Sequence, residues 1–145
     1  MNEEKHTAAL IEVREAIDEA LRDPRGLLPR QRRIMSMLSL GTQHIVELWL
    51  HKNHAIKPGA YVKHEWLKAE DKRLALRLAG VLTKGLEKIK DSDKILALAR
   101  GIEHDRNDVV YGAPLANDLV LKEKINAFLE LKKAVEDAVG ELKWE

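Results

Sequence analysis

Residues 32–52 read RRIMSMLSLGTQHIVELWLHK, and this stretch decides the fold class. Apolar positions recur along it at steps of three and four, as in the series Ile34, Leu38, Gly41, Ile45 and Leu48. The polar strip that remains is narrow and consists of Arg32, Ser36, Ser39, Gln43 and Glu47. A helix with so much apolar surface is central in a bundle, because a peripheral helix needs a broad polar face. The sequence therefore predicts a long central helix over residues 29–51.

Four further helices are expected around this one. The helical period returns at about residues 5–22, 69–89, 93–110 and 117–142, between breaks rich in Pro, Gly or Asp. The connection 52–68 is long, and Tyr61 and Trp66 are expected to fold it back onto the core. Aromatic residues make up only 4% of the chain, which is low for an all-β core. The sequence predicts an all-α, up-and-down bundle of about five helices in one domain, 1–145.

Composition narrows the classes of function. Basic and acidic residues number 25 and 24, so the net charge of +1 does not by itself predict nucleic-acid binding. The absence of cysteine excludes disulfides and thiolate chemistry. Because the N-terminal sequence is not that of a signal peptide and no apolar run approaches about 18 residues, we expect a cytoplasmic protein with no membrane partner. The lack of Cys, together with many Lys, Glu and Arg residues, is typical of a thermophile.

Residues 103–112, EHDRNDVVYG, carry the strongest functional signal. On a helix over 93–110, Arg106 lies near the middle of the apolar face, where a hydrophobic residue is expected. That face consists of Ile95, Leu98, Ala99, Ile102 and Val109. A guanidinium buried without partners is costly, so it either pairs or opens onto a wet cleft. Three explanations are open: an ion pair with an acid, a contact across a dimer interface, or phosphate binding, which suits the planar guanidinium.

The stretch Arg106-Asn107-Asp108-Val109-Val110-Tyr111-Gly112 resembles the signature of HEPN domains. These are compact helical bundles in which an arginine, usually followed by a polar residue, precedes a histidine by a few positions near the end of a late helix. Residues 32–52 are similar to the long core helix of that family, with an acid, Glu47, ahead of a basic end at Lys52. The resemblance extends from about residue 28 to about residue 140 and implies a HEPN-like bundle.

The resemblance also implies a function. Many HEPN domains are homodimers whose arginine-bearing helices meet in one composite site, and active members are metal-independent endoribonucleases, often toxins paired with a nucleotidyltransferase antitoxin. In such a site Arg106 would hold a phosphate, Asn107 would orient the phosphate or fix Arg106, and Tyr111 would donate a hydrogen bond or stack on a base.

One departure from the family pattern concerns the proton-transfer group. Tyr111 stands where the family has its histidine, and no histidine follows residue 104. We therefore expect an RNA- or nucleotide-binding protein, or an endoribonuclease with an altered catalytic site. The alternative is a structural or adaptor bundle that acts through dimerisation.

Two other groups of residues have candidate chemistry. Five arginines within twelve residues can track a phosphate backbone or form a solvated helix start: Arg22, Arg25, Arg30, Arg32 and Arg33. Of these, Arg30, Arg32 and Arg33 are the candidate nucleic-acid-binding residues. His44 and His51 could be metal ligands with His54 or His64, but no H-E-x-x-H or similar spacing accompanies them. We expect no metal and no cofactor.

Overall fold

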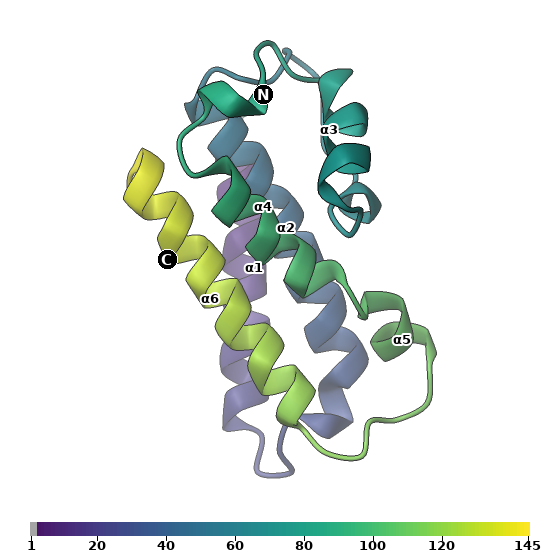
Figure 1. The fold of residues 1–145 in the computed structure, drawn as a ribbon. Helices are drawn as coiled ribbons and strands as arrows, with labels where there is room; N and C mark the ends of the chain where they lie inside the picture. Colours follow the sequence, from purple (N-terminus) through teal and green to yellow (C-terminus); the bar gives the residue numbers. More distant parts are fainter. Residues whose placement is uncertain (1–2) are drawn as a thin grey trace.

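Two long antiparallel helices form one side of the molecule (Figure 1). The structure is a computed structural model that describes residues 3–145. The first hairpin consists of α1 (Glu3–Arg22), the short 3-10 helix η1 (Leu28–Arg30) and α2 (Gln31–Lys52). The rest of the chain adds η2 (His64–Trp66), α3 (Asp71–Ala79), η3 (Leu86–Lys88), α4 (Ser92–Glu103), α5 (Arg106–Tyr111) and α6 (Leu119–Val139). The predicted all-α bundle is confirmed.

Helix α2 is the central element, as its apolar pattern predicts. It packs against α1, α4, α5 and α6, and α6 lies alongside both α2 and α4 (Figure 1). Close packing depends on Gly41, because a Cβ at that position would lie 2.7 Å from the Phe128 ring of α6 and 3.1 Å from Val13 of α1. A glycine here lets three helices approach one another at a single level of the core.

The predicted helix over 69–89 is too long. Helix α3 ends at Ala79, and the chain then pairs with the connection that follows α2. Thr83 donates its N–H to the Ala55 carbonyl at 2.8 Å, and Lys57 donates to the Val81 carbonyl at 2.9 Å. In a longer α3 helix, the Thr83 N–H and the Val81 carbonyl would form hydrogen bonds within the helix. Here they bond to Ala55 and Lys57 instead, which satisfies them equally well.

The predicted helix over 93–110 is divided in two. Helix α4 ends at Glu103 and α5 begins at Arg106. At the break, Lys124 of α6 donates from Nζ to the Gly101 carbonyl at 2.6 Å, and this is the oxygen that Asp105 N–H would use in a continuous helix. A side chain from a distant helix therefore takes the place of one helical hydrogen bond and lets the chain turn.

The connection after α2 folds back onto the core, but only one of the two expected aromatic anchors contributes. Trp66 packs against the core, whereas Tyr61 is 57% exposed, so the expectation for Tyr61 is wrong. Val62 and Leu67 are fully buried in its place. No helix among residues 3–145 has the length and the apolar character needed to cross a membrane.

Candidate functional site

The break between α4 and α5 opens a cavity of about 290 Å³ beside η2. We call it the Arg106 cleft, and its lining residues are His64, Glu65, Lys68, Glu103, Arg106, Asn107 and Tyr111. The three residues expected to form a site, Arg106, Asn107 and Tyr111, thus lie at one cavity. The fold adds His64, which is distant from them in the sequence, and Glu103, which the sequence suggests as one possible ion-pair partner of Arg106.

Glu103 is the buried acid of the cleft. It is 2% exposed, and its Oε1 accepts a hydrogen bond from the Ser39 hydroxyl at 2.6 Å. Its Oε2 lies 3.5 Å from Nδ1 of His64. Burial raises the pKa of Glu103, because desolvation disfavours the carboxylate, while the Ser39 hydrogen bond and the charges of His64 and Arg106 act in the opposite direction. The acid is therefore held in one orientation beside the histidine.

Ser39 and Glu47 both differ from the expectation for α2. Each was assigned to the polar strip, yet they are 2% and 3% exposed. Ser39 can be buried because its hydroxyl donates to Glu103. Glu47 can be buried because its Oε1 accepts the Val62 N–H at 2.7 Å. The polar strip of α2 therefore includes two groups that bind distant parts of the chain.

Arg106 occupies the first position of α5, so it is not in the middle of a continuous apolar stripe. Its Nη1 donates to Asn107 Oδ1 at 3.0 Å, and its buried Nε has no hydrogen-bond partner among residues 3–145. The charge of Arg106 acts on the buried acid Glu103. Asn107 thus holds one edge of the guanidinium, and the buried Nε edge is unsatisfied in the part of the chain that the structure describes.

Helix α5 is held in place by side chains of the α2 N-terminus. The buried Gln31 donates from Nε2 to the Val109 carbonyl at 3.0 Å and accepts the Leu115 N–H at 2.9 Å. Arg32 donates to the Gly112 carbonyl at 3.1 Å. These bonds position the short helix, while Tyr111 itself is 77% exposed at the rim of the cleft.

His64 is a candidate residue of this cleft that the sequence did not indicate. It comes from η2, in the connection between α2 and α3, and it was considered only as a metal ligand beside His44. The family pattern places a histidine after the arginine, and none is there, but the fold brings one to Arg106 from earlier in the chain. No spacing in the sequence points to this, because the approach depends on how the connection packs.

A second hollow adjoins the Arg106 cleft. This basic groove, of about 1310 Å³, runs between the α3 region and α4 and shares Glu65 and Lys68 with the cleft. Its basic residues are Lys68, Lys72, Arg73, Arg77, Arg100 and His104, and its acidic ones are Glu65 and Glu70. The groove therefore carries an excess of positive charge that leads to the cleft, although the net charge of the chain is only +1.

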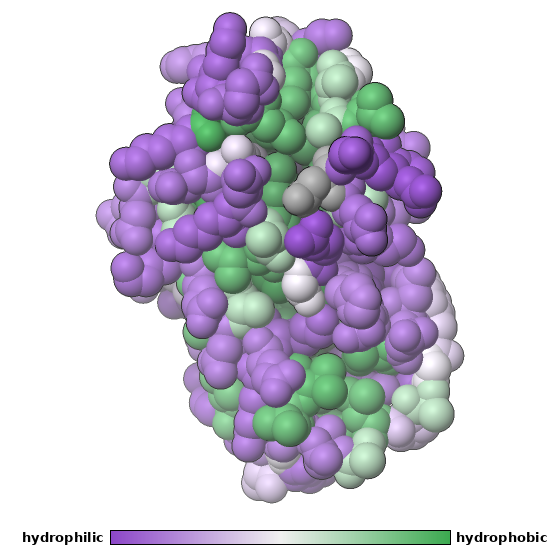
Figure 2. Space-filling view, viewed as in Figure 1, coloured by the Kyte–Doolittle hydropathy of each residue, from purple (hydrophilic) through white to green (hydrophobic). Residues whose placement is uncertain are grey.

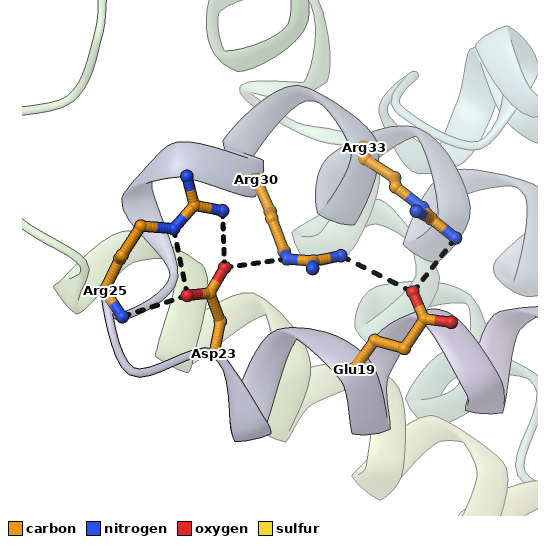
Figure 3. A network of polar contacts seen from close by, with 5 residues as sticks. All are labelled: Glu19, Asp23, Arg25, Arg30 and Arg33. Atoms are coloured by element: carbon orange, nitrogen blue, oxygen red, sulfur yellow. Dashed lines mark hydrogen bonds and ion pairs between the residues drawn. The ribbon is translucent and has the colours of Figure 1, made fainter.

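Three of the five arginines near the first turn, Arg25, Arg30 and Arg33, form an ion-pair network with Asp23 and Glu19 (Figure 3). Asp23 accepts from Arg25 at 2.8 Å and from Arg30 at 3.0 Å, and these hydrogen bonds, those of Arg25 first, hold its pKa well below the usual range. Glu19 pairs with Arg30 at 3.4 Å and with Arg33 at 3.3 Å. Binding of nucleic acid by Arg30, Arg32 and Arg33 stays a prediction, and the protein itself already supplies acceptors for all three.

The expected histidine grouping is met only in part. His64 belongs to the Arg106 cleft, whereas His54 lines one cavity with His51 and His6, and His44 lies beside His6. His6 received no role from the sequence.

No family model, no curated protein and no solved structure matches this chain.

Proposed function

We propose that the protein is a HEPN-like endoribonuclease that binds RNA in the basic groove and cleaves it in the Arg106 cleft. One observation carries the proposal: Arg106 and His64 line the same cavity, and the buried carboxylate of Glu103 lies beside the histidine. Cleavage of a phosphodiester needs positive charge at the phosphate and a group that exchanges protons near neutral pH. The two residues supply these two requirements.

The chemistry is an attack by the ribose 2′-OH on the adjacent phosphorus. His64 accepts the hydroxyl proton as the O–P bond forms, and the protonated His64 then gives this proton to the 5′-oxygen as the bond between that oxygen and phosphorus breaks. Glu103 faces Nδ1 of His64, which leaves Nε2 for the substrate and stabilises the protonated ring. Arg106 binds the phosphate oxygens as negative charge develops, and Asn107 holds the guanidinium.

The basic groove supplies the remaining contacts to RNA. Lysines and arginines along α3 and α4 neutralise phosphates of a strand whose scissile group sits in the cleft. Tyr111, exposed at the rim, offers a ring on which a base can stack. Recognition of this kind favours single-stranded RNA, because unpaired bases are free to stack on an aromatic side chain.

Assembly into a homodimer, and pairing with a nucleotidyltransferase antitoxin, belong to the same proposal. The family resemblance supports them, together with hydrophobic surface that a partner can cover. Tyr111 is 77% exposed and Leu119, the first residue of α6, is 58% exposed. Figure 2 shows hydrophobic side chains gathered at the lower end of the viewed face, over the start of α6.

Binding of fluorescently labelled single-stranded RNA tests the function, with anisotropy measured over a series of salt concentrations. We expect saturable binding that weakens as salt rises, and an affinity about tenfold lower or worse for Arg106→Ala, since a hydrogen bond to a charged group contributes about 1.5–3 kcal/mol. Lys143→Ala removes a positive charge that lines neither the cleft nor the groove, and serves as control. RNA binding that is absent, or unchanged by Arg106→Ala, contradicts the proposal.

The same exposed surface favours a second candidate, an adaptor bundle that acts through dimerisation alone. Here the polar cluster of Ser39, Glu103 and His64 would only fix the packing of α4 on α2. This candidate predicts a stable dimer with no affinity for RNA, so sedimentation and the RNA titration separate the two functions.

A further inference from the structure

A second group of histidines lies where the start of α1 packs against the last part of α2. Nδ1 of His6 is 2.8 Å from Nδ1 of His44, and Nε2 of His6 is 3.8 Å from Oε2 of Glu47. The ring centroid of His51 is 5.9 Å from that of His6. Three imidazoles and one carboxylate therefore meet between two helices, outside the Arg106 cleft.

We propose that His6, His44 and Glu47 bind a divalent transition-metal ion of the zinc type, and that the His51 ring turns toward them to supply a fourth ligand. One ligand atom from each of the first three residues lies within 4.8 Å of those of the other two. Imidazole nitrogen and carboxylate oxygen are a donor set that zinc prefers, and soft thiolate ligands are not required. His44, Glu47 and His51 follow one another at steps of three and four, so α2 presents them along one face.

Burial distinguishes this group from a set of surface histidines. His6 is 1% exposed and Glu47 is 3% exposed, so a ring nitrogen and a carboxylate face each other away from water. Burying such groups is costly unless they are paired or coordinate a metal.

A backbone hydrogen bond fixes the orientation of the Glu47 carboxylate. Its Oε1 accepts the Val62 N–H at 2.7 Å, which leaves Oε2 directed to His6. Ligands of metal sites are oriented by hydrogen bonds of this kind. The same bond joins the site to the connection that carries His64, two residues after Val62, so a bound metal would fasten α1, α2 and that connection together.

The geometry allows an ion to enter with a small adjustment. Tetrahedral bonds of about 2.1 Å separate two ligand atoms by about 3.4 Å, so the Nδ1 atoms of His6 and His44, now 2.8 Å apart, must separate by roughly half an ångström. With Nδ1 of His6 as the ligand atom, the Glu47 carboxylate must also shift from the Nε2 side of that ring, where Oε2 lies 3.8 Å from Nε2. His44 is only half-buried and can make this shift. A cavity of about 360 Å³, lined in part by His6, His51 and His54, provides the path from solvent. Lys52 lies at this mouth, but its charge is paired with Glu3 at 3.3 Å.

Zinc titration of the chelator-treated full-length protein, followed by calorimetry, tests the proposal. We expect one ion per chain, a rise in melting temperature with zinc, and a visible absorption spectrum of four-coordinate cobalt when Co²⁺ is used instead. His44→Gln is expected to weaken zinc binding at least tenfold and to abolish the rise in melting temperature.

His104→Gln is the matched control, because His104 is 74% exposed and lies outside the cluster. If His44→Gln does not fold, His51→Gln replaces it, because His51 is less buried. The absorption spectrum of bound Co²⁺ in His51→Gln must then differ from that of wild type. Wild-type protein that takes up no stoichiometric zinc, or a cluster variant that binds zinc as tightly as His104→Gln, overturns the proposal. The RNA-binding test uses variants of Arg106 and Lys143, whereas the zinc test uses variants of histidines. Failure of the zinc proposal therefore does not count against the proposed function, and the reverse also holds.

Discussion

The Ser39 hydroxyl donates to Glu103 Oε1 at 2.6 Å, and both residues are almost completely buried. This hydrogen bond joins the middle of α2 to the last residue of α4, one turn before Arg106. It is the contact that fixes the carboxylate beside His64 and so determines the shape of the cleft.

Removal of the Ser39 hydroxyl should destabilise the protein. Ser39→Ala leaves the buried Glu103 without this donor, and an unsatisfied buried group costs about 1–3 kcal/mol, more when charged. Urea unfolding followed by circular dichroism measures the change. Ser36→Ala, one turn earlier on α2 and less buried, is the control and should change the unfolding free energy by less than about 0.5 kcal/mol. Equal effects of the two substitutions would show that the Ser39 hydrogen bond does not stabilise the fold.

The stability of the protein should depend on pH through Glu103. Burial raises the folded-state pKa of this acid above its unfolded value, so the stabilisation is complete below the unfolded value of about 4.3 and is lost as pH rises through the folded value. Relative to Glu103→Gln, wild type should therefore lose stability as the pH rises above about 4.3, the unfolded-state pKa of a glutamate. Each unit by which the folded-state pKa exceeds the unfolded value corresponds to about 1.4 kcal/mol in the free energy of unfolding. The same comparison with Glu123→Gln, an exposed acid, should show no such trend, and a trend of the opposite sign for Glu103 would contradict the assignment.

Two glycine substitutions should have opposite effects. Gly41→Ala places a methyl group against the Phe128 ring and Val13, and overpacking of a dense core costs about 1–3 kcal/mol. Gly101→Ala adds a methyl group in open space on α4 and should stabilise the helix by up to about 1 kcal/mol. Thermal unfolding of the two variants provides the comparison. A Gly41→Ala protein as stable as wild type would mean that the three helices are not in close contact there.

Arg106→Ala should change stability only slightly. The guanidinium donates a hydrogen bond to the exposed Asn107, and among residues 3–145 it forms no ion pair with an acid. A loss below about 1 kcal/mol is expected, whereas breaking a buried ion pair costs about 3–5 kcal/mol. Chemical unfolding distinguishes these values, and the larger loss would assign Arg106 a structural role.

The local spacing of apolar residues predicts most of the helices. The helix ends that differ from the prediction are set by contacts with residues distant in the sequence. The apolar series in α2 is enough to place it at the centre, because burial of one face follows directly from the spacing. The end of α4 was not predictable in this way, since the donor that ends it is Lys124, in another helix. The same holds for the end of α3, where backbone pairing with residues 55–57 replaces helical bonds.

The candidate site was predictable in part. Arg106, Asn107 and Tyr111 are adjacent in sequence, so a motif can identify them together. His64 and Glu103 join them only through the packing of the connection, and His6 joins His44 only because α1 and α2 are antiparallel neighbours. A polar residue on α2, such as Ser39, reads as solvent-facing until its partner on another helix is known.

Single-turnover cleavage of end-labelled single-stranded RNA shows whether Arg106 and His64 act on one phosphodiester. Wild type should produce fragments with 2′,3′-cyclic phosphate ends, and His64→Gln should bind the RNA but cleave it at least about a hundredfold more slowly. Wild-type protein that leaves the RNA intact, or a His64→Gln variant that cleaves at the wild-type rate, would show that these residues do not cleave RNA together.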